Sequence, residues 1–269
     1  MTATDKLFAG SIPDIYDGLL VPLIFERYAR DLAERIAVTR PQEVLETAAG
    51  TGVLTSAMAS RLPAEGRIVA SDLNQPMLDR AASRHNLNGR VTWRQADALA
   101  LPFDDRSFDI VACQFGVMFF PDKVKGYKEV RRVLRPRRRF FFNVWDRLAE
   151  NEFAETVNDA VAAFLPKDPP AFMARTPHGY HDVGKIRNDL TAAGFSDVSI
   201  ETVAHASKAP SPREPAIAFC QGTPLRNEIE ARGASLQGAT DAAAAALAKR
   251  FGKGPIEGRI KAHVIVATA

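Results

Sequence analysis

Short runs of apolar and β-branched residues alternate with helix-like stretches between residues 42 and 145, and this alternation limits the possible folds most strongly. Strands joined through helices are typical of parallel sheets, because a parallel pair needs a crossover connection. We therefore predict an α/β fold with a Rossmann-like, mostly parallel, doubly wound sheet and helices on both faces. The five runs are QEVLETA (42–48), GRIVASD (66–72), RVTWRQAD (90–97), FDIVACQF (108–115) and RRFFFNVW (138–145).

Helix signals separate these runs and continue after them. Pro76 stands in the first turn of QPMLDRAASRH, and Asp182 is a candidate N-cap of a helix that ends at Gly194. Further strands are predicted at 196–207 and 258–269, and one or two amphipathic helices at 10–37. We expect a single domain over 1–269, with a cofactor-binding core at 41–146 and helical cap segments at 1–40, 147–181 and 208–257.

Composition and residue spacing argue against a nucleic-acid-binding protein, a disulfide-rich protein, a metalloprotein and a membrane-spanning protein. A net charge of +3 with 25% charged residues gives no reason to expect nucleic acid or an anionic membrane as partner. Cys113 and Cys220 lie far apart, which argues against a disulfide framework or a zinc site and favours a cytoplasmic location. The longest early apolar run, at 18–25, is too short to span a membrane. We expect no metal site, because His85, His205 and His263 have no partners at ligand spacing.

The stretch ETAAGTGVL is a glycine turn that follows an acidic residue. Gly50 and Gly52 permit a tight bend and a close backbone approach to a ligand. A dinucleotide fingerprint would need a third glycine where Thr55 stands, and Glu46 would repel a pyrophosphate. A ligand that carries an ammonium would be attracted instead, which favours S-adenosylmethionine over NAD.

Two more acids end the next two predicted strands. Asp72, 20 residues after Gly52, is placed to accept hydrogen bonds from a ribose diol, and Asp97 could accept one from an adenine amino group. A lone glycine pair is often only a turn, and a lone aspartate is often only a helix cap. The joint occurrence of three acids at three successive strand ends favours a cofactor site. Its apolar walls would be Leu73, Met77, Ala98 and Leu99.

The segments ETAAGTGVLT, SDLNQPML, QADALALPFDDRSFDIV, CQFGVMFFPD and EVRRVLRP together resemble the class I S-adenosylmethionine-dependent methyltransferases. Within that class the chain is similar to the small-molecule enzymes of the ubiquinone/menaquinone-biosynthesis type. The resemblance is strong over about residues 40–146 and implies seven strands, the last of which, ending HVIVATA, runs antiparallel beside the fifth.

The resemblance also implies roles for individual residues. The methionine part would be flanked by the loop after the first strand, with Glu46, Ala48, Gly50, Thr51 and Gly52. Ribose and adenine would be held after the second and third strands, by Asp72, Leu73, Met77, Asp97 and Ala98. Gln114, at the end of the fourth strand, would face the methionyl group. The chain departs from the family with Glu46 for the usual Asp, Ala48 for the usual first Gly, and RPRRR for the usual RPGGR turn at 137–138.

Candidates for the acceptor end lie outside the predicted core. His178, Tyr180 and His181 follow the fifth strand, and a histidine there could remove a proton from the acceptor, although a loop histidine often only makes hydrogen bonds. Tyr16 is a candidate to close over the methionyl end. The run RRVLRPRRR (131–139) precedes a strand at the edge opposite the cofactor, which favours a solvated surface and leaves an anionic partner open.

These residues predict an S-adenosylmethionine-dependent methyltransferase that acts on a small-molecule acceptor by in-line displacement. CQFGVMFF stands where base-methylating relatives have an Asn/Asp-Pro-Pro-aromatic tetrad, which argues against a nucleobase acceptor. The alternatives are an NAD-dependent oxidoreductase and a non-catalytic S-adenosylmethionine-binding protein. The acceptor atom (oxygen, nitrogen or carbon), the use of a general base and the oligomeric state, homodimer included, stay open.

Overall fold

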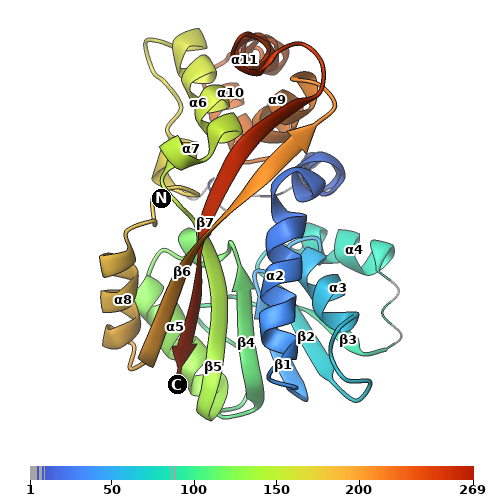
Figure 1. The fold of residues 1–269 in the computed structure, drawn as a ribbon, viewed down its shortest axis with the longest axis vertical. Coiled ribbons are helices and arrows are strands. Elements are labelled where there is room, and N and C mark those ends of the chain that lie inside the picture. Colours follow the sequence, from blue (N-terminus) through green and yellow to red (C-terminus); the bar gives the residue numbers. More distant parts are fainter. Residues whose placement is uncertain (1–4, 6–7, 9, 86, 88) are drawn as a thin grey trace. The chain divides into compact units, whose positions relative to one another are not determined.

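The structure, a computed structural model, describes residues 5, 8, 10–85, 87 and 89–269 (Figure 1). Within these residues, seven strands form one sheet in the order β3-β2-β1-β4-β5-β7-β6. All seven predicted strands are present, and the central strands β1 and β4 are buried along nearly their whole length, as parallel strands covered on both faces are. Their bounds are β1 (Glu43–Thr47), β2 (Arg67–Asp72), β3 (Val91–Gln95), β4 (Phe108–Gln114), β5 (Leu134–Trp145), β6 (Ser196–Ala209) and β7 (Ile256–Thr268).

The register makes β1 the centre of the parallel part of the sheet. Glu46 stands opposite Ala70 of β2 on one side and Ala112 of β4 on the other. The last strand runs antiparallel to β5, since hydrogen bonds join residue 137 to residue 269 and residue 146 to residue 261. The predicted α/β fold, with its mostly parallel sheet and antiparallel last strand, is confirmed.

The helices follow the predicted segments, with one departure. Residues 10–37 form three consecutive helical segments, of which the middle one, η2, is a π-helix that contains Pro22. Proline lacks the N–H for the α-helical bond and clashes with the preceding turn, which a widened helix accommodates. The bounds are α1 (Ile12–Ile15), η2 (Tyr16–Phe25), α2 (Glu26–Ala37), α3 (Val53–Ala59), α4 (Gln75–Arg84), η3 (Val117–Phe119), α5 (Lys123–Val133), η4 (Leu148–Glu150), α6 (Glu152–Phe164), α7 (Phe172–Arg175), α8 (Val183–Ala192), α9 (Arg213–Gln221), α10 (Leu225–Ala231) and α11 (Leu236–Phe251).

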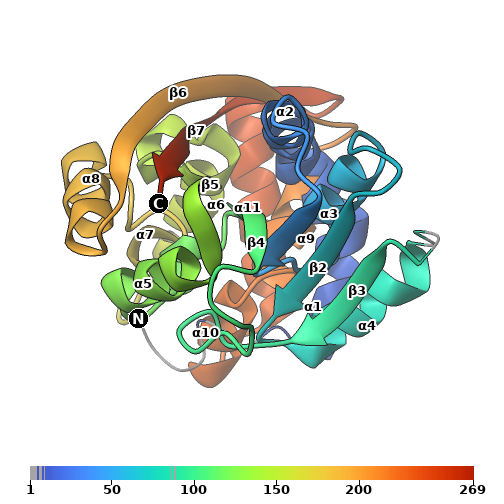
Figure 2. The ribbon, with the colours of Figure 1, turned by 90° about the horizontal axis from the view of Figure 1, so that it is seen from below.

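Helices cover both faces of the parallel strands (Figure 2). On one face, α2 and α3 form an apolar core with the sheet, in which Val44, Ala112 and Phe141 are buried. On the other face, Tyr127 of α5 contacts the rings of Phe140 and Phe142, with centroids 5.8 and 5.6 Å away. Successive residues of β5 therefore alternate between the two faces, as the strand geometry requires.

The chain folds into two compact units. The sheet unit comprises Glu26–Val144, His181–Val203 and His263–Ala269; the helical unit comprises Met1–Phe25, Trp145–Tyr180 and Ala204–Ala262. The single-domain organisation with its core and cap boundaries stays a prediction. Among the described residues, no helix has both the length and the apolar character needed to cross a bilayer.

The arginine run at 131–139 is partly used inside the protein. Arg131 donates to the carbonyl of Gly194, while Arg135 and Arg138 both contact Asp109. Arg137 adopts φ +62°, so the RPRRR turn takes a left-handed conformation that glycine would adopt more easily. The expected solvated surface therefore also makes internal bonds, which join α5 to the turn after α8 and β5 to β4.

Candidate cofactor site

The loop from β1 to α3 takes a left-handed path. Ala48, Gly50 and Gly52 have φ values of +53°, +57° and +82°. A Cβ on Gly52 would lie 2.7 Å from the Trp93 ring, so only glycine fits there. Ala48 adopts the strained conformation at a cost of about 1–2 kcal/mol. The replacement of the usual glycine at position 48 thus adds strain to the loop.

Asp72 anchors this loop to the end of β2. Its Oδ2 accepts the N–H of Gly50 at 2.9 Å, and its Oδ1 accepts the N–H of Asn74 at 2.8 Å. Burial raises the pKa of Asp72, although the hydrogen bonds from Asn74 and Gly50 oppose that rise. A carboxylate offers about four acceptor positions. The Asp72 carboxylate, which also accepts from the side-chain amide of Asn74 at 3.3 Å, therefore uses most of these positions to fix the loop.

Glu46 lies at the end of β1 with 1% of its surface exposed. The Thr55 hydroxyl donates to its Oε2 at 2.5 Å. Burial raises the pKa of Glu46 to about 8, with a further rise from the charge of Asp72, against the Thr55 bond. The sequence predicted an ionised carboxylate at position 46, whereas the raised pKa favours its protonated form at neutral pH. Thr55 stands where a dinucleotide fingerprint would need a glycine, and its hydroxyl is the hydrogen-bond partner of Glu46.

The turn after β4 packs against the glycine loop. Gln114, at the end of β4, is 8% exposed, and Phe115 has φ +51°. A Cβ on Gly116 would lie 2.4 Å from the Cβ of Ala48, so the two loops meet with no room for a second side chain. This contact brings the predicted residues Ala48 and Gln114 to one edge of the sheet.

Buried polar atoms at this edge that make no hydrogen bond to the described part of the chain include the hydroxyl oxygen of Thr51 and the side-chain nitrogen of Asn143. Buried polar groups are nearly always paired in folded proteins, so each unpaired one calls for an explanation. Asn143 was not predicted; the only signal was one amide within the apolar run FFFNVW.

His85, which sequence analysis set aside with the other histidines, also contacts the loop. Its Nε2 lies 3.2 Å from the carbonyl oxygen of Thr51. The contact comes from the end of α4, about 30 residues after the loop, and no local pattern encodes such a tertiary approach.

The remaining predicted adenine and ribose residues differ in exposure. Leu73 is 43% exposed and Met77 is buried. Asp97 is exposed and accepts the N–H of Leu99 at 2.9 Å, while Ala98 is half-buried. Asp97 thus closes a local turn after β3, and its contact with adenine stays a prediction.

The predicted acceptor-end residues are divided between the units. Tyr16 of the helical unit stacks on Phe25 with centroids 5.2 Å apart. His178 and Tyr180 are buried in the same unit, whereas His181, half-buried, belongs to the sheet unit. The Nδ1 of His178 lies 2.9 Å from the carbonyl oxygen of Asp146. Because a carbonyl only accepts, Nδ1 carries the proton and Nε2 of the neutral ring is the basic atom.

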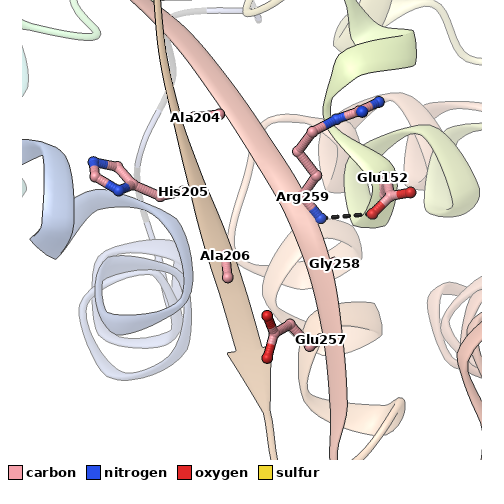
Figure 3. A pocket seen from close by; sticks show the side chains of 7 residues that line it. All are labelled: Glu152, Ala204, His205, Ala206, Glu257, Gly258 and Arg259. Atoms are coloured by element: carbon pink, nitrogen blue, oxygen red, sulfur yellow. Dashed lines mark hydrogen bonds between the residues drawn. The ribbon is translucent and has the colours of Figure 1, made fainter.

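A cavity of about 370 Å³ lies in the helical unit, between β6, β7 and the start of α6 (Figure 3). None of the predicted site residues lines it. The N–H of Arg259 donates to Glu152 across its wall at 2.6 Å. Among the described residues, no group of three His, Cys, Asp or Glu side chains could hold a metal ion.

Comparison with known proteins identifies the family. Residues 44–137 match the methyltransferase domain family. The ubiquinone/menaquinone biosynthesis C-methyltransferase UbiE of Idiomarina loihiensis is 30% identical over 193 residues, which cover 67% of this chain and 75% of that protein.

Solved structures show the same fold. A candidate methyltransferase from Bacillus halodurans superposes with a TM-score of 0.56 at 20% identity, over 88% of this chain and 98% of that one. A Haemonchus contortus N-methyltransferase in complex with phosphomonomethylethanolamine and S-adenosylhomocysteine gives a TM-score of 0.53 at 16% identity, over 97% and 61%. With the acid-flanked glycine loop at the carboxyl edge of its sheet, this chain belongs to the S-adenosylmethionine-dependent methyltransferases.

Proposed function

We propose that this methyltransferase transfers a methyl group to a carbon atom of a small aromatic acceptor of the quinol type, by in-line displacement. The names of relatives support the acceptor class, since several are C-methyltransferases of ubiquinone/menaquinone biosynthesis. One observation carries the cofactor half of the proposal. Glu46 and Asp72 are both buried at adjacent strand ends, and neither has a cationic partner among the described residues.

Two buried acids without a protein cation fit a cationic ligand. S-adenosylmethionine supplies, when bound, an ammonium group and a methyl group activated on a sulfonium. The unpaired hydroxyl of Thr51 suits a ligand with several polar groups. We assign the methionine end to Glu46, Ala48, Gly50, Thr51 and Gly52, and the ribose to Asp72.

Residues further along the edge complete the proposed cofactor contacts. We assign the adenine to Leu73, Met77, Asp97 and Ala98, and the methyl end to Gln114, with Tyr16 as its cover. The buried rings near the end of β4 would exclude water, and in-line positioning of an acceptor can lower a barrier by about 7–11 kcal/mol.

The acceptor end is assigned to the segments outside the core. Residues 1–40, 147–181 and 208–257 would bind the acceptor, while 41–146 hold the cofactor, all within one functional domain. His178 is the proposed base, since its Nε2 is the basic atom of a ring already oriented by Asp146. Tyr180 and His181 are proposed to contact the acceptor. The two buried free cysteines support a reducing, cytoplasmic location.

Proton release on cofactor binding tests the role of Glu46. The cationic cofactor should ionise this mostly protonated carboxyl, so binding at pH 7 should release up to about one proton. Calorimetric titration with S-adenosylmethionine in buffers of different ionisation enthalpy measures this number. The Glu46→Gln variant should lose the release, whereas Glu43→Gln, half-exposed on the same strand, should keep it.

A second assay tests the acceptor class. Purified protein should methylate a demethylated quinol at carbon and leave single-stranded oligonucleotides unmodified, as followed by mass spectrometry. Tight binding of NAD without binding of S-adenosylmethionine would contradict the cofactor assignment. Methylation of an oxygen or nitrogen atom would agree with the cofactor assignment and contradict the proposed carbon acceptor.

A further inference from the structure

A polar residue extends the carboxyl edge of the sheet beyond the predicted site. On the face that α2 and α3 cover, the apolar Phe141 is followed two residues later by Asn143. The same face of β4 changes from Ala112 to Gln114, and the register places Gln114 opposite Asn143. Because residues two apart share a face of a strand, the two amides lie side by side at this edge.

Asn143 holds the strained turn that follows β4. The N–H of Phe115 lies 3.0 Å from the Oδ1 of Asn143 and 3.1 Å from its carbonyl oxygen. A bulky residue rarely adopts φ +51°, so surrounding contacts must hold it. The Tyr28 ring meets Phe115 edge-on, with centroids 5.4 Å apart, and Gly116 packs on Ala48.

The amide of Asn143 is unfavourable for stability alone. The residue has no exposed surface, and its side-chain nitrogen has no hydrogen-bond partner among the described residues. A leucine of similar volume would avoid an unpaired buried donor. A side chain that carries this penalty, and that holds a strained turn beside Gln114, is better explained by function than by packing.

We propose that Asn143 is a positioning residue for methyl transfer. Its Oδ1 fixes the Phe115 N–H, and through it the turn that carries Gln114 toward the methyl end of the cofactor. This inference rests on the proposed assignment of Gln114. Asn143 would act through the backbone of Phe115, without touching the reacting atoms or the cofactor.

Three variants test the proposal. Asn143→Leu removes the side-chain acceptor and leaves the backbone carbonyl, Asn143→Asp keeps both, and Phe142→Leu is a matched control because Phe142 is equally buried on the opposite face. We expect Asn143→Leu to weaken S-adenosylhomocysteine binding about tenfold in calorimetry, while its melting temperature stays near that of the wild type. Asn143→Asp should restore affinity to within about threefold. Phe142→Leu should lower the melting temperature and leave affinity unchanged.

Hydrogen exchange of the Phe115 amide gives a readout that does not depend on the cofactor. It should accelerate at least tenfold in Asn143→Leu and stay unchanged in Phe142→Leu. Wild-type affinity or wild-type exchange in Asn143→Leu would overturn the proposal, as would equal losses of affinity in Asn143→Leu and Phe142→Leu. If the wild-type protein bound neither S-adenosylmethionine nor S-adenosylhomocysteine, the proposed function would fail, and the exchange measurement would still decide whether Asn143 fixes the turn.

Discussion

Asp109 at the amino edge of the sheet and Asp72 at the carboxyl edge are almost equally buried, with 5% and 7% of their surfaces exposed. Burial alone would raise the pKa of both. At Asp109 the bonds from Arg135 and from the N–H groups of Glu43 and Gln42 outweigh burial and lower the pKa. At Asp72 the donors are N–H groups and the side-chain amide of Asn74, and the pKa stays raised.

The two aspartates differ in whether the protein itself supplies a positive charge beside the carboxylate. The protein supplies the counter-charge of Asp109 from its own arginines. Among the described residues it supplies none for Asp72 or for Glu46, and burial raises the pKa of Glu46 to about 8. A buried acid without a cation is unfavourable in the folded protein alone, so the carboxyl edge is arranged for a positively charged molecule.

Removal of the acid at the amino edge should have the largest effect. Asp109→Ala leaves Arg135 without its carboxylate and two N–H groups without an acceptor, so we expect a loss of about 3 kcal/mol in the free energy of unfolding. Urea denaturation measures it, and S-adenosylhomocysteine affinity should stay within about twofold. Because the folded pKa is lowered, this stabilisation is complete above the ordinary value of 3.8 and disappears as the pH falls through the folded pKa. If Asp109→Ala lost S-adenosylhomocysteine affinity and kept its stability, the structural role of Asp109 would be contradicted.

The corresponding change at the carboxyl edge should act on binding. Asp72→Ala removes the acceptor of Gly50 and the proposed ribose contact, and should weaken S-adenosylhomocysteine binding by about 1.5–3 kcal/mol, roughly 10- to 100-fold. Isothermal titration measures this loss. Asp79→Ala, exposed on α4, is the control and should bind normally. Unchanged affinity in Asp72→Ala would remove the ribose assignment.

The pH dependence of stability should separate Glu46 from the other acids. Its folded pKa of about 8 exceeds the ordinary 4.5, so the folded protein retains a proton that the unfolded chain loses. Stability should therefore fall with rising pH between these values, by about 1 kcal/mol per pH unit. Glu46→Gln should flatten this slope in denaturation curves at pH 5, 6 and 7. An equal slope in both proteins would show that Glu46 is ionised without a ligand.

The smallest expected effect concerns backbone strain. Ala48→Gly relieves a left-handed alanine and should raise the free energy of unfolding by about 1 kcal/mol. Thermal denaturation would detect this as a higher melting temperature. A lower one would mean that the Cβ packing against Gly116 outweighs the strain.

Sequence patterns were sufficient for the sheet and for the acids of the site. The strand periods predicted all seven strands, and Glu46 and Asp72 lie at the ends of β1 and β2 as expected. Two strands begin earlier than predicted: β7 by two residues, at Ile256, and β5 by four, at Leu134, because charged residues at the exposed start of β5 hide the strand pattern.

Features that depend on contacts between distant residues could not be predicted. The protonation of Glu46 depends on burial, and the position of His85 depends on how α4 meets the loop. Asn143 could be placed in a strand, but one amide in an apolar run does not reveal that it bonds to a residue 28 positions away. The roles of His178, Tyr180, His181 and Tyr16 stay predictions.

The contact between Ala48 and Gly116 has a consequence for how such sequences can diverge. A Cβ at position 116 would lie 2.4 Å from the Cβ of Ala48 and 2.7 Å from the Sγ of Cys113. Ala48→Gly combined with Gly116→Ala should therefore be tolerated better than Gly116→Ala alone, although the contact with Cys113 remains. Across homologues, a residue larger than glycine at position 116 should occur together with smaller residues at positions 48 and 113.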